Sequence, residues 1–492
     1  MTIAELVQSA SAETAGLGLG RRRFAGVEVG LSADSCLKCN VCNTVCPVAR
    51  VTDLFPGPKY VGPQAQRFRL GTMRSPGTPE WIAIPTPDRS VDYCSGCGWC
   101  STACPAEVKI AEMNNRARGA LRSGHRPRLR DWLLGQTDLT GRMGVLTAPI
   151  ANWSLHNRLF RRMIDMVVRI DRRAPLPRFA GRTFRSRLPS RQKTADLPAT
   201  GPERTVVYFH GCAANYYEPN VAGAALDVLR RNGFEVVVPP QVCCGLPLIS
   251  NGLYGQARDR AAKNLAVFAR YARAGYRIVG TSTSCTHTFK SEYREMLDLD
   301  DADARAVADA TWDICEFLVD LDDKGKLDTG FGTLNQQLPY HAPCQLRSHG
   351  IGLPAMDLFS LVPGLTATDM DHDCCGIAGT YGLKSEKYEI AMAVGEPLFA
   401  KIRATGAADV ACDSETCRWQ IAAATGTRLR HPVEILADAY AAGDRERAAG
   451  SSGGNGAGAG SAGVGSGAGS TASGAGATAD ATEGAGSAVL AE

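Results

Sequence analysis

The C-terminal half of the chain alternates short apolar runs with longer segments in which apolar residues recur every three or four positions. The runs are rich in Val and Ile and too short for buried helices, which predicts strands that alternate with helices. Such an order is typical of α/β domains with parallel sheets. We expect strands at 205–209, 235–238, 278–281 and 408–410, and helices at about 255–274 and 384–404.

This pattern occurs twice, in segments 204–340 and 341–442. Each copy has one cysteine, then a Cys-Cys-Gly triplet, then a further cysteine about 40 residues on. The cysteines follow predicted strands, at the sheet edge where α/β folds bind ligands. We therefore expect two α/β Cys-Cys-Gly domains with these boundaries.

The rest of the chain has a different composition in each segment. The predicted order is a flexible extension at 1–33, a cysteine-rich helical domain at 34–130 and a basic connector at 131–203. Residues 450–492 are almost entirely Gly, Ala and Ser, which predicts a disordered tail because little there can form a core. The expected fold class is a multidomain chain: an α-helical ferredoxin-type domain followed by two α/β domains with parallel sheets.

The formal net charge of +4 is unevenly distributed. Residues 111–200 carry 19 Arg and Lys against 6 Asp and Glu, which suits either a solvated surface or an anionic partner. We expect no nucleic acid partner. No segment reaches the roughly 18 apolar residues that span a bilayer, and no secretory signal is expected. In a reducing cytoplasm, 18 cysteines indicate metal binding rather than disulfides.

Eight cysteines form two C-x-x-C-x-x-C-x-x-x-C-P runs. This spacing is typical of ferredoxins with two [4Fe–4S] clusters, in which the last cysteine of each run binds the other cluster. Zinc is the weaker alternative, because its sites use paired C-x-x-C motifs. We therefore assign one cluster to Cys36, Cys39, Cys42 and Cys104, and the other to Cys94, Cys97, Cys100 and Cys46.

The Cys-Cys-Gly repeats offer a second class of metal site. Adjacent cysteines rarely pair with each other because the disulfide is strained, so thiolates from several loops are expected to form a metal pocket. The alternative is buried cysteines without a ligand, which is how we interpret Cys315 in its apolar segment. The predicted ligands are Cys212, Cys243, Cys244 and Cys285 in the first repeat, and Cys344, Cys374, Cys375 and Cys417 in the second.

Several segments resemble one known family. They include the first cysteine run at 36–47 and the segments 55–59, 209–212, 243–247, 281–285, 374–382 and 415–421. They are most similar to the C subunit of anaerobic glycerol-3-phosphate dehydrogenases, within a wider group that includes the B subunit of heterodisulfide reductases and the iron–sulfur subunits of glycolate and lactate oxidases.

The resemblance implies an iron–sulfur electron-transfer subunit without flavin of its own. A partner FAD subunit would oxidise sn-glycerol 3-phosphate, and electrons would pass to menaquinone at the cytoplasmic face of the cell membrane. Alternatives are a disulfide reductase that acts by itself and a relay for a 2-hydroxy-acid oxidase. No G-x-G-x-x-G fingerprint follows a strand and no P-loop is present, so we expect no nucleotide site. No catalytic residue is assigned.

Relatives of the heterodisulfide reductase type use five cysteines in each Cys-Cys-Gly site, and this sequence departs from that pattern. Thr288 stands where a C-x-x-C after Cys285 would end, and Ser414 replaces a cysteine before Cys417. Cys412 is a sterically reasonable substitute ligand for the missing cysteine at 414, because residues two apart in a strand share a face. One or two additional clusters are therefore expected.

Residues 153–173 predict an amphipathic helix that ends before Pro175. A broad apolar face beside an arginine-rich edge suits either the membrane surface or packing against the protein's own core or the flavin subunit. The predicted edge comprises Arg158, Arg161, Arg162, Asp165, Arg169 and Arg172. Three histidines near the cysteines, His210, His287 and His341, are expected to form hydrogen bonds around the sites rather than to transfer protons.

Overall fold

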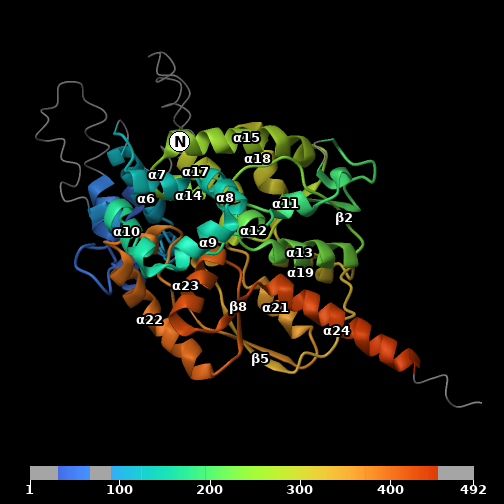
Figure 1. The fold of residues 1–492 in the computed structure, drawn as a ribbon. Coiled ribbons are helices and arrows are strands. Elements are labelled where there is room, and N and C mark those ends of the chain that lie inside the picture. Colours follow the sequence, from blue (N-terminus) through green and yellow to red (C-terminus); the bar gives the residue numbers. More distant parts are fainter. Residues whose placement is uncertain (1–31, 67–89, 123–124, 194–195, 372, 453–492) are drawn as a thin grey trace, which may run out of the picture. The chain divides into compact units, whose positions relative to one another are not determined.

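A computed structural model describes residues 32–66, 90–122, 125–193, 196–371 and 373–452, with the side chains from 450 onward left out. The chain divides into two units at Glu446, and only residues 447–452 of the second unit are described. The predicted extension at 1–33 and the predicted tail at 450–492 lie almost entirely outside the described residues. All of the structure below concerns the first unit (Figure 1).

The dicluster region, residues 32–122, contains only helices and loops among its described residues. Short helices follow the cysteines of each run because three cysteines at two-residue gaps keep the chain in tight turns. Asn40 and Gly98 begin two of these helices with positive φ angles of 76° and 86°. The elements are η1 (Ser32–Ser35), α3 (Val41–Thr44), η2 (Tyr60–Gln64), η3 (Ser90–Tyr93), α5 (Trp99–Thr102) and α6 (Ile110–Arg122).

The connector, residues 129–193, is also helical in its described part. The predicted single helix at 153–173 is wrong, because the chain forms two helices that meet at Asn157. The Asn157 side chain accepts hydrogen bonds from the amides of Leu159 and Phe160 and so caps the second helix. The elements are α7 (Leu129–Gly135), α8 (Thr137–Leu146), α9 (Ala148–His156), α10 (Arg158–Val168), α11 (Phe184–Arg187) and η4 (Ser190–Lys193).

The two Cys-Cys-Gly repeats form two modules, which we name the first module (205–323) and the second module (from 336 onward). The first module contains a four-stranded parallel sheet in the order β2-β1-β3-β4. All five residues of the central strand β1 are buried, because helices cover both faces of a parallel sheet. The strands are β1 (Thr205–Phe209), β2 (Glu235–Val237), β3 (Arg277–Gly280) and β4 (Thr311–Asp313). The helices are α12 (Ala213–Tyr216), α13 (Pro219–Arg231), α14 (Leu246–Ser250), α15 (Tyr254–Arg273), α16 (Thr283–His287), η5 (Thr288–Glu292), α17 (Tyr293–Leu297), α18 (Ala302–Ala310) and α19 (Ile314–Asp323).

The second module repeats this topology, with the parallel sheet order β6-β5-β7-β8. Its first strand begins at Gln336, so the sheet starts before the predicted boundary at 340/341. The strands are β5 (Gln336–His341), β6 (Leu365–Asp369), β7 (Asp409–Cys412) and β8 (Arg428–Arg430). The helices are α20 (Cys344–His349), α21 (Pro354–Ser360), η6 (Tyr381–Leu383), α22 (Tyr388–Thr405), α23 (Glu415–Thr425) and α24 (Pro432–Ser452). The predicted α/β architecture with parallel sheets is confirmed for both repeats.

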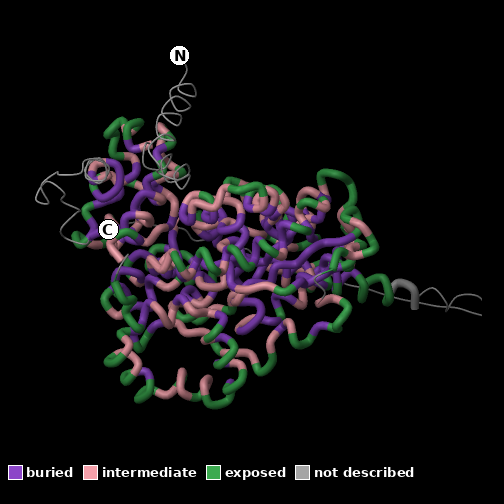
Figure 2. The backbone as a smooth tube through the Cα atoms, turned by 90° about the horizontal axis from the view of Figure 1, so that it is seen from above, coloured by how far each residue is buried: buried purple, intermediate pink, exposed green. Residues whose placement is uncertain are grey.

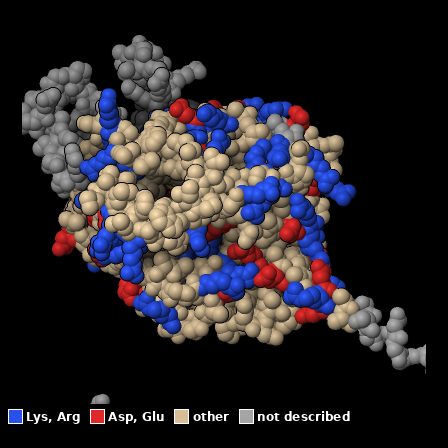
Figure 3. All heavy atoms as spheres, viewed as in Figure 1, with Lys and Arg blue, Asp and Glu red and all other residues tan. Residues whose placement is uncertain are grey.

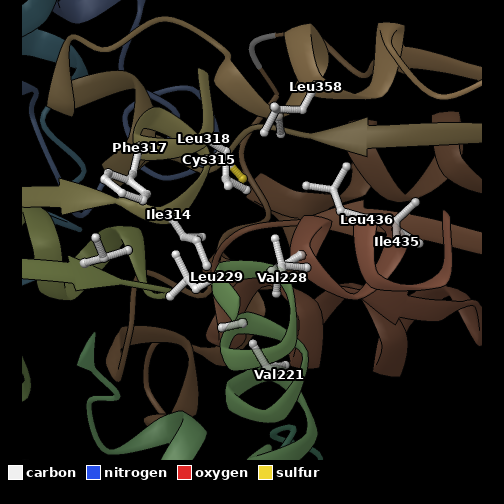
Figure 4. Packing of buried hydrophobic residues seen from close by; sticks show 14 of the residues in the cluster. Val221, Val228, Leu229, Ile314, Cys315, Phe317, Leu318, Leu358, Ile435 and Leu436 are labelled. Carbon is white, nitrogen blue, oxygen red and sulfur yellow. The ribbon is translucent and has the colours of Figure 1, made fainter. Parts of the chain in front are cut away.

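The two modules share one hydrophobic core. Figure 4 shows side chains of α13 and α19 from the first module pointing towards those of α21 and α24 from the second. Cys315 lies in this core and is fully buried, as its apolar segment predicts. Figure 2 shows that buried segments run through the interior of the fold. The strands at the centre of each sheet, β1 and β3 in the first and β5 and β7 in the second, are mostly buried. This shared core fixes the carboxyl ends of the two sheets relative to each other, which is where the cysteines lie.

Candidate metal centres

The structure brings the first three cysteines of the first run together with the last cysteine of the second run. Cys42 is buried, and its pKa is raised by burial and by the neighbouring thiols of Cys36, Cys104 and Cys39. Cys39 is exposed, so this group reaches the surface. These are the neighbours that the predicted ligand assignment requires, although the ligation itself stays a prediction.

The second thiol group contains the remaining four cysteines of the two runs. Burial raises the pKa of Cys46 to about 11, and the thiols of Cys94 and Cys42 add to this effect. Cys97 and Cys100 are buried against the same neighbours, and burial raises both of their pKa values. Three of the thiols, Cys94, Cys97 and Cys100, come from the second run.

A contact between this group and the second module was not predicted. After burial, the thiol of Cys374 is the largest contributor to the raised pKa of Cys97. Cys46, Cys94 and Cys374 also belong to one apolar cluster, and the Ser348 hydroxyl donates a 3.2 Å hydrogen bond to the Cys97 carbonyl. The second group of the dicluster region therefore lies directly against the Cys-Cys-Gly site of the second module.

In the first module, the four predicted cysteines meet around Cys243. Hydrogen bonds from the thiols of Cys212 and Cys244 lower the pKa of Cys243 well below its usual range, while the pKa values of Cys212 and Cys244 are raised. Cys244 also contacts Cys285, which follows β3 on helix α16. The backbone amide of Gly245 points at the Cys243 sulfur over 3.5 Å.

The second module has the same arrangement around Cys374. Hydrogen bonds from Cys344 and Cys375 lower the pKa of Cys374, and the Gly376 amide lies 3.4 Å from the Cys374 sulfur. The Cys375 and Cys417 sulfurs are 3.1 Å apart. A fifth thiol is present here, because Cys412 also hydrogen-bonds to Cys417.

These residues fit iron–sulfur clusters. All eighteen cysteines are free, including sulfurs in direct contact, and most of the clustered thiols are buried. Burial disfavours thiolates unless a cation compensates the charge, and compact sets of four or five sulfurs from several loops match the donors that such clusters need. In each module the first cysteine of the adjacent pair is already favoured as a thiolate by two S–H donors.

The register of the sheets corrects one part of the sequence comparison between the repeats. Tyr208 on β1 hydrogen-bonds to Thr281 over 2.9 Å, and Tyr340 on β5 hydrogen-bonds to Asp413 over 2.7 Å. Thr281 and Asp413 are thus equivalent, which makes Ser282 the counterpart of Ser414.

Both of these serines lie at the N-cap position of a helix that carries the last predicted ligand. Ser282 precedes α16 with Cys285, and Ser414 precedes α23 with Cys417. Thr288, the position expected from the sequence, is fully buried on η5 and donates a 2.7 Å hydrogen bond to the Ser284 carbonyl. In both repeats, serine therefore replaces the first cysteine of a C-x-x-C motif, and the predicted departure at Thr288 is wrong.

The histidines near the cysteines differ in their surroundings. The His210 Nδ1 atom lies 2.6 Å from the Gly211 carbonyl, and His287 lies 3.8 Å from the Glu292 carboxyl group. Burial lowers the pKa of both imidazoles to about 4. His341 is different, because it lies beside Cys412 and Cys417 with one donor atom of each residue within 4.8 Å of the others.

The connector exposes large apolar side chains on four consecutive helices, a set that we name the apolar belt. Its members come from α7 to α10, with Met166 and Leu146 each 79% exposed. Figure 3 shows a largely uncharged surface over α8–α10, hollowed in one place and bordered by Lys and Arg side chains. The belt consists of Leu129, Leu139, Met143, Leu146, Ile150, Trp153, Leu159, Phe160, Met163, Met166 and Val167.

The predicted polar edge of this region is partly wrong. Arg161 is buried, because its guanidinium group donates to the carbonyls of Asp171, Arg172 and Ala174 and closes the chain after α10. Ile164 and Val168 pack against the core of the second module. The remaining arginines of the predicted edge are exposed: Arg158, Arg162, Arg169 and Arg172.

A cavity of about 780 Å³ adjoins the belt. Leu129 and Val167 belong to both, and Tyr93, which precedes Cys94 in the chain, also lines the cavity. Basic side chains outnumber acidic ones in its wall: Arg122, Arg128, Arg130, Arg169 and Lys387 against Asp92 and Glu386. No helix among the described residues is long and apolar enough to cross a membrane.

Comparisons with protein families match the three cysteine-rich parts of the chain. A family described as "4Fe-4S dicluster domain" matches residues 32–108, and one described as "Cysteine-rich domain" matches residues 206–290 and 338–422. Both Cys-Cys-Gly sites and both cysteine runs fall within these matches.

Individual relatives match across the modules. The chain is 36% identical over 422 residues to the C subunit of anaerobic glycerol-3-phosphate dehydrogenase from Escherichia coli (strain K12), which covers 83% of this chain and 99% of the relative. It is 28% identical over 376 residues to the B subunit of fumarate reductase (CoM/CoB) from Methanothermobacter marburgensis, covering 75% and 63%. It is 25% identical over 408 residues to the probable glycolate oxidase iron-sulfur subunit of Bacillus subtilis (strain 168), covering 79% and 88%.

Proposed function

Because this chain belongs to the family of the anaerobic glycerol-3-phosphate dehydrogenase C subunit, we propose that it relays electrons from a partner FAD subunit to menaquinone at the membrane. The partner would oxidise sn-glycerol 3-phosphate. The observation that carries the proposal is that Cys374 of the second module lies in one buried cluster with Cys46 and Cys94, which connects the dicluster region to the modules.

The thiol groups support a relay because they follow one another through the structure. The first group reaches the surface at the exposed Cys39, beside Leu37, which is 67% exposed. The second group adjoins the second module through Cys97. The two modules then meet where α16 packs on α20, the helices that carry Cys285 and Cys344. The surface around Cys39 is the proposed docking site for the flavin subunit.

The apolar belt and its arginine border support a peripheral position on the cytoplasmic face of the cell membrane. Exposed apolar surface on this scale is uncommon on soluble proteins and marks an interaction site. Leu, Met and Trp side chains can enter the acyl boundary of a bilayer while arginines contact anionic head groups. The side chains of Arg158 and Arg162 border the belt on α10 itself.

The cavity beside the belt is the proposed site of the quinone. Its apolar rim at Leu129 and Val167 is continuous with the proposed membrane surface, so a lipid-soluble substrate would reach it without crossing water. Tyr93, which also lines the cavity, precedes Cys94 in the chain. The cationic wall would favour the negative charge that develops as a quinone is reduced.

Anaerobic affinity purification of the full chain from its native cells tests the proposed complex. The expected result is co-purification of a flavoprotein that oxidises glycerol 3-phosphate. Recovery of a 2-hydroxy-acid oxidase instead, or heterodisulfide reduction by the isolated chain, would contradict the proposal.

Two matched pairs of variants test the membrane and quinone parts. Met166→Glu should weaken binding to vesicles containing anionic lipid, whereas Leu197→Glu, at an exposed site outside the belt, should not. Arg128→Trp should fill the cavity and weaken binding of a water-soluble naphthoquinone about tenfold, or 1.4 kcal/mol. Arg126→Trp is its control, because Arg126 is exposed but does not line the cavity. Equal behaviour within either pair argues against the corresponding site.

A further inference from the structure

The two modules differ at one pair of neighbouring strand residues beside the thiols. In the first module, Phe209 at the end of β1 pairs with Gly280 at the end of β3. In the second module, the equivalent pair on β5 and β7 is His341 and Cys412. Cys212 and Cys344 each follow their strand by three residues, so the pairs occupy the same position relative to the sites.

The imidazole of His341 is buried against the thiols of the second module. Its side chain is 1% exposed, and among the described residues the group that its ring reaches is the sulfur of Cys417. A buried polar group is costly unless its nitrogen atoms are paired, so an imidazole whose neighbours are thiols calls for a physical explanation. One donor atom each of His341, Cys412 and Cys417 lies within 4.8 Å of the others.

The second module lacks the cysteine that five-cysteine relatives have at the position of Ser414, so another residue could supply the fifth ligand. Ser414 does not offer a thiolate, and its hydroxyl lies 3.4 Å from that of Thr416. Cys412 is fully buried and hydrogen-bonds to Cys417, so its sulfur faces the same group of thiols. The first module has only Phe209 and Gly280 here, which supply no donor.

We infer that the second module holds its iron with a mixed set of ligands, in which Cys412 and the imidazole of His341 join Cys344, Cys374, Cys375 and Cys417. Neutral imidazole is a good ligand for iron and also serves as a ligand in some iron–sulfur centres. The first module keeps four cysteines, so the two sites would differ in their ligands. This inference requires a cluster in the second module but does not depend on which partner donates or accepts the electrons.

The experiment uses the full chain, purified anaerobically with its own metal after growth with ¹⁵N-histidine. Pulsed EPR should detect a directly coordinated ¹⁵N nucleus, and this coupling should disappear in His341→Phe, which carries the residue of the first module. His210→Phe is the control, since His210 lies near the first-module site with Nδ1 against the Gly211 carbonyl, and the coupling should persist. Iron analysis should show that Cys412→Ala and His341→Phe each lose iron relative to the wild type.

Two results would overturn the inference. One is a wild-type spectrum without ¹⁵N coupling, or a coupling that survives in His341→Phe. The other is an unchanged iron content in both Cys412→Ala and His341→Phe. If His341→Phe fails to fold, the ¹⁵N coupling in the wild-type spectrum and the iron content of Cys412→Ala still test the inference. Loss of glycerol 3-phosphate activity with the ¹⁵N coupling intact would instead concern the proposed function.

Discussion

The glycines of the two Cys-Cys-Gly triplets provide a sharp test because their surroundings differ. Both adopt the left-handed backbone conformation, with φ of 95° at Gly245 and 82° at Gly376. A Cβ atom on Gly245 would meet the Ala257 carbonyl oxygen on α15 at 3.5 Å, an ordinary contact. A Cβ atom on Gly376 would overlap the Ala391 carbonyl oxygen on α22 and lie 2.8 Å from its carbon.

The two alanine variants should therefore differ in stability. Gly245→Ala is destabilised mainly by the left-handed conformation, by about 1–2 kcal/mol. Gly376→Ala has the same penalty and also forces backbone apart, which adds about 1–3 kcal/mol because a helix backbone cannot move as a flexible side chain can. The displacement would also pull the Gly376 amide from the Cys374 sulfur, so iron should be lost from the second module.

Thermal unfolding under anaerobic conditions and iron analysis measure both effects. The melting temperature of Gly376→Ala should lie below that of Gly245→Ala by about 2–4 °C for each additional kcal/mol. Equal melting temperatures and equal iron contents would refute the reasoning, because they would mean that α22 does not press on this turn.

Four further predictions concern the rest of the structure. Cys46→Ser should alter the EPR signal of the cluster assigned to Cys94, Cys97 and Cys100, and an effect confined to the other cluster would contradict the exchange of ligands between the runs. Lys384→Met removes the 2.9 Å ion pair with buried Asp131, which keeps its ion pairs with Arg122 and Arg130, and should cost about 1.5–3 kcal/mol; a double-mutant cycle with Asp131→Asn measures the coupling, and zero coupling would contradict the pair. Arg161→Met should destabilise by about 2–4 kcal/mol because three carbonyls lose a buried donor, whereas exposed Arg162→Met should stay within about 0.5 kcal/mol. Burial beside Glu112 and Glu295 raises the pKa of Glu292 to about 8, so its stabilising contribution is present below the unfolded pKa near 4.3 and is lost as the pH rises through 8. The melting temperature of Glu292→Gln relative to wild type should therefore rise between pH 5 and 8 and then level. A difference that stays constant with pH would contradict this.

Part of the fold could be predicted from the sequence because the patterns are local. Strand β1 has the predicted bounds, since five consecutive apolar and β-branched residues bounded by polar ones favour one structure. The helix at 153–173 could not be predicted correctly, because its periodicity continues through Asn157 although the side chain of that residue caps a new helix. Arginine is usually exposed, but Arg161 is buried because it donates to backbone carbonyls that come into reach only when the chain is folded.

The sequence by itself predicted the eight cysteines of the two runs as cluster ligands, because cysteine spacing within one loop directly limits how thiolates surround a cluster. Only the tertiary structure decided how these groups are related. The cluster of Cys46, Cys94 and Cys374 joins residues far apart in the chain, and the pairing of His341 with Cys412 depends on the register of two strands that are separated in the chain by β6 and several helices. These neighbours are brought together by packing between and within the modules, so no local sequence pattern predicts them. The distance along the chain between two cysteines does not show whether they become neighbours, because the shared core decides how the two sheets are placed.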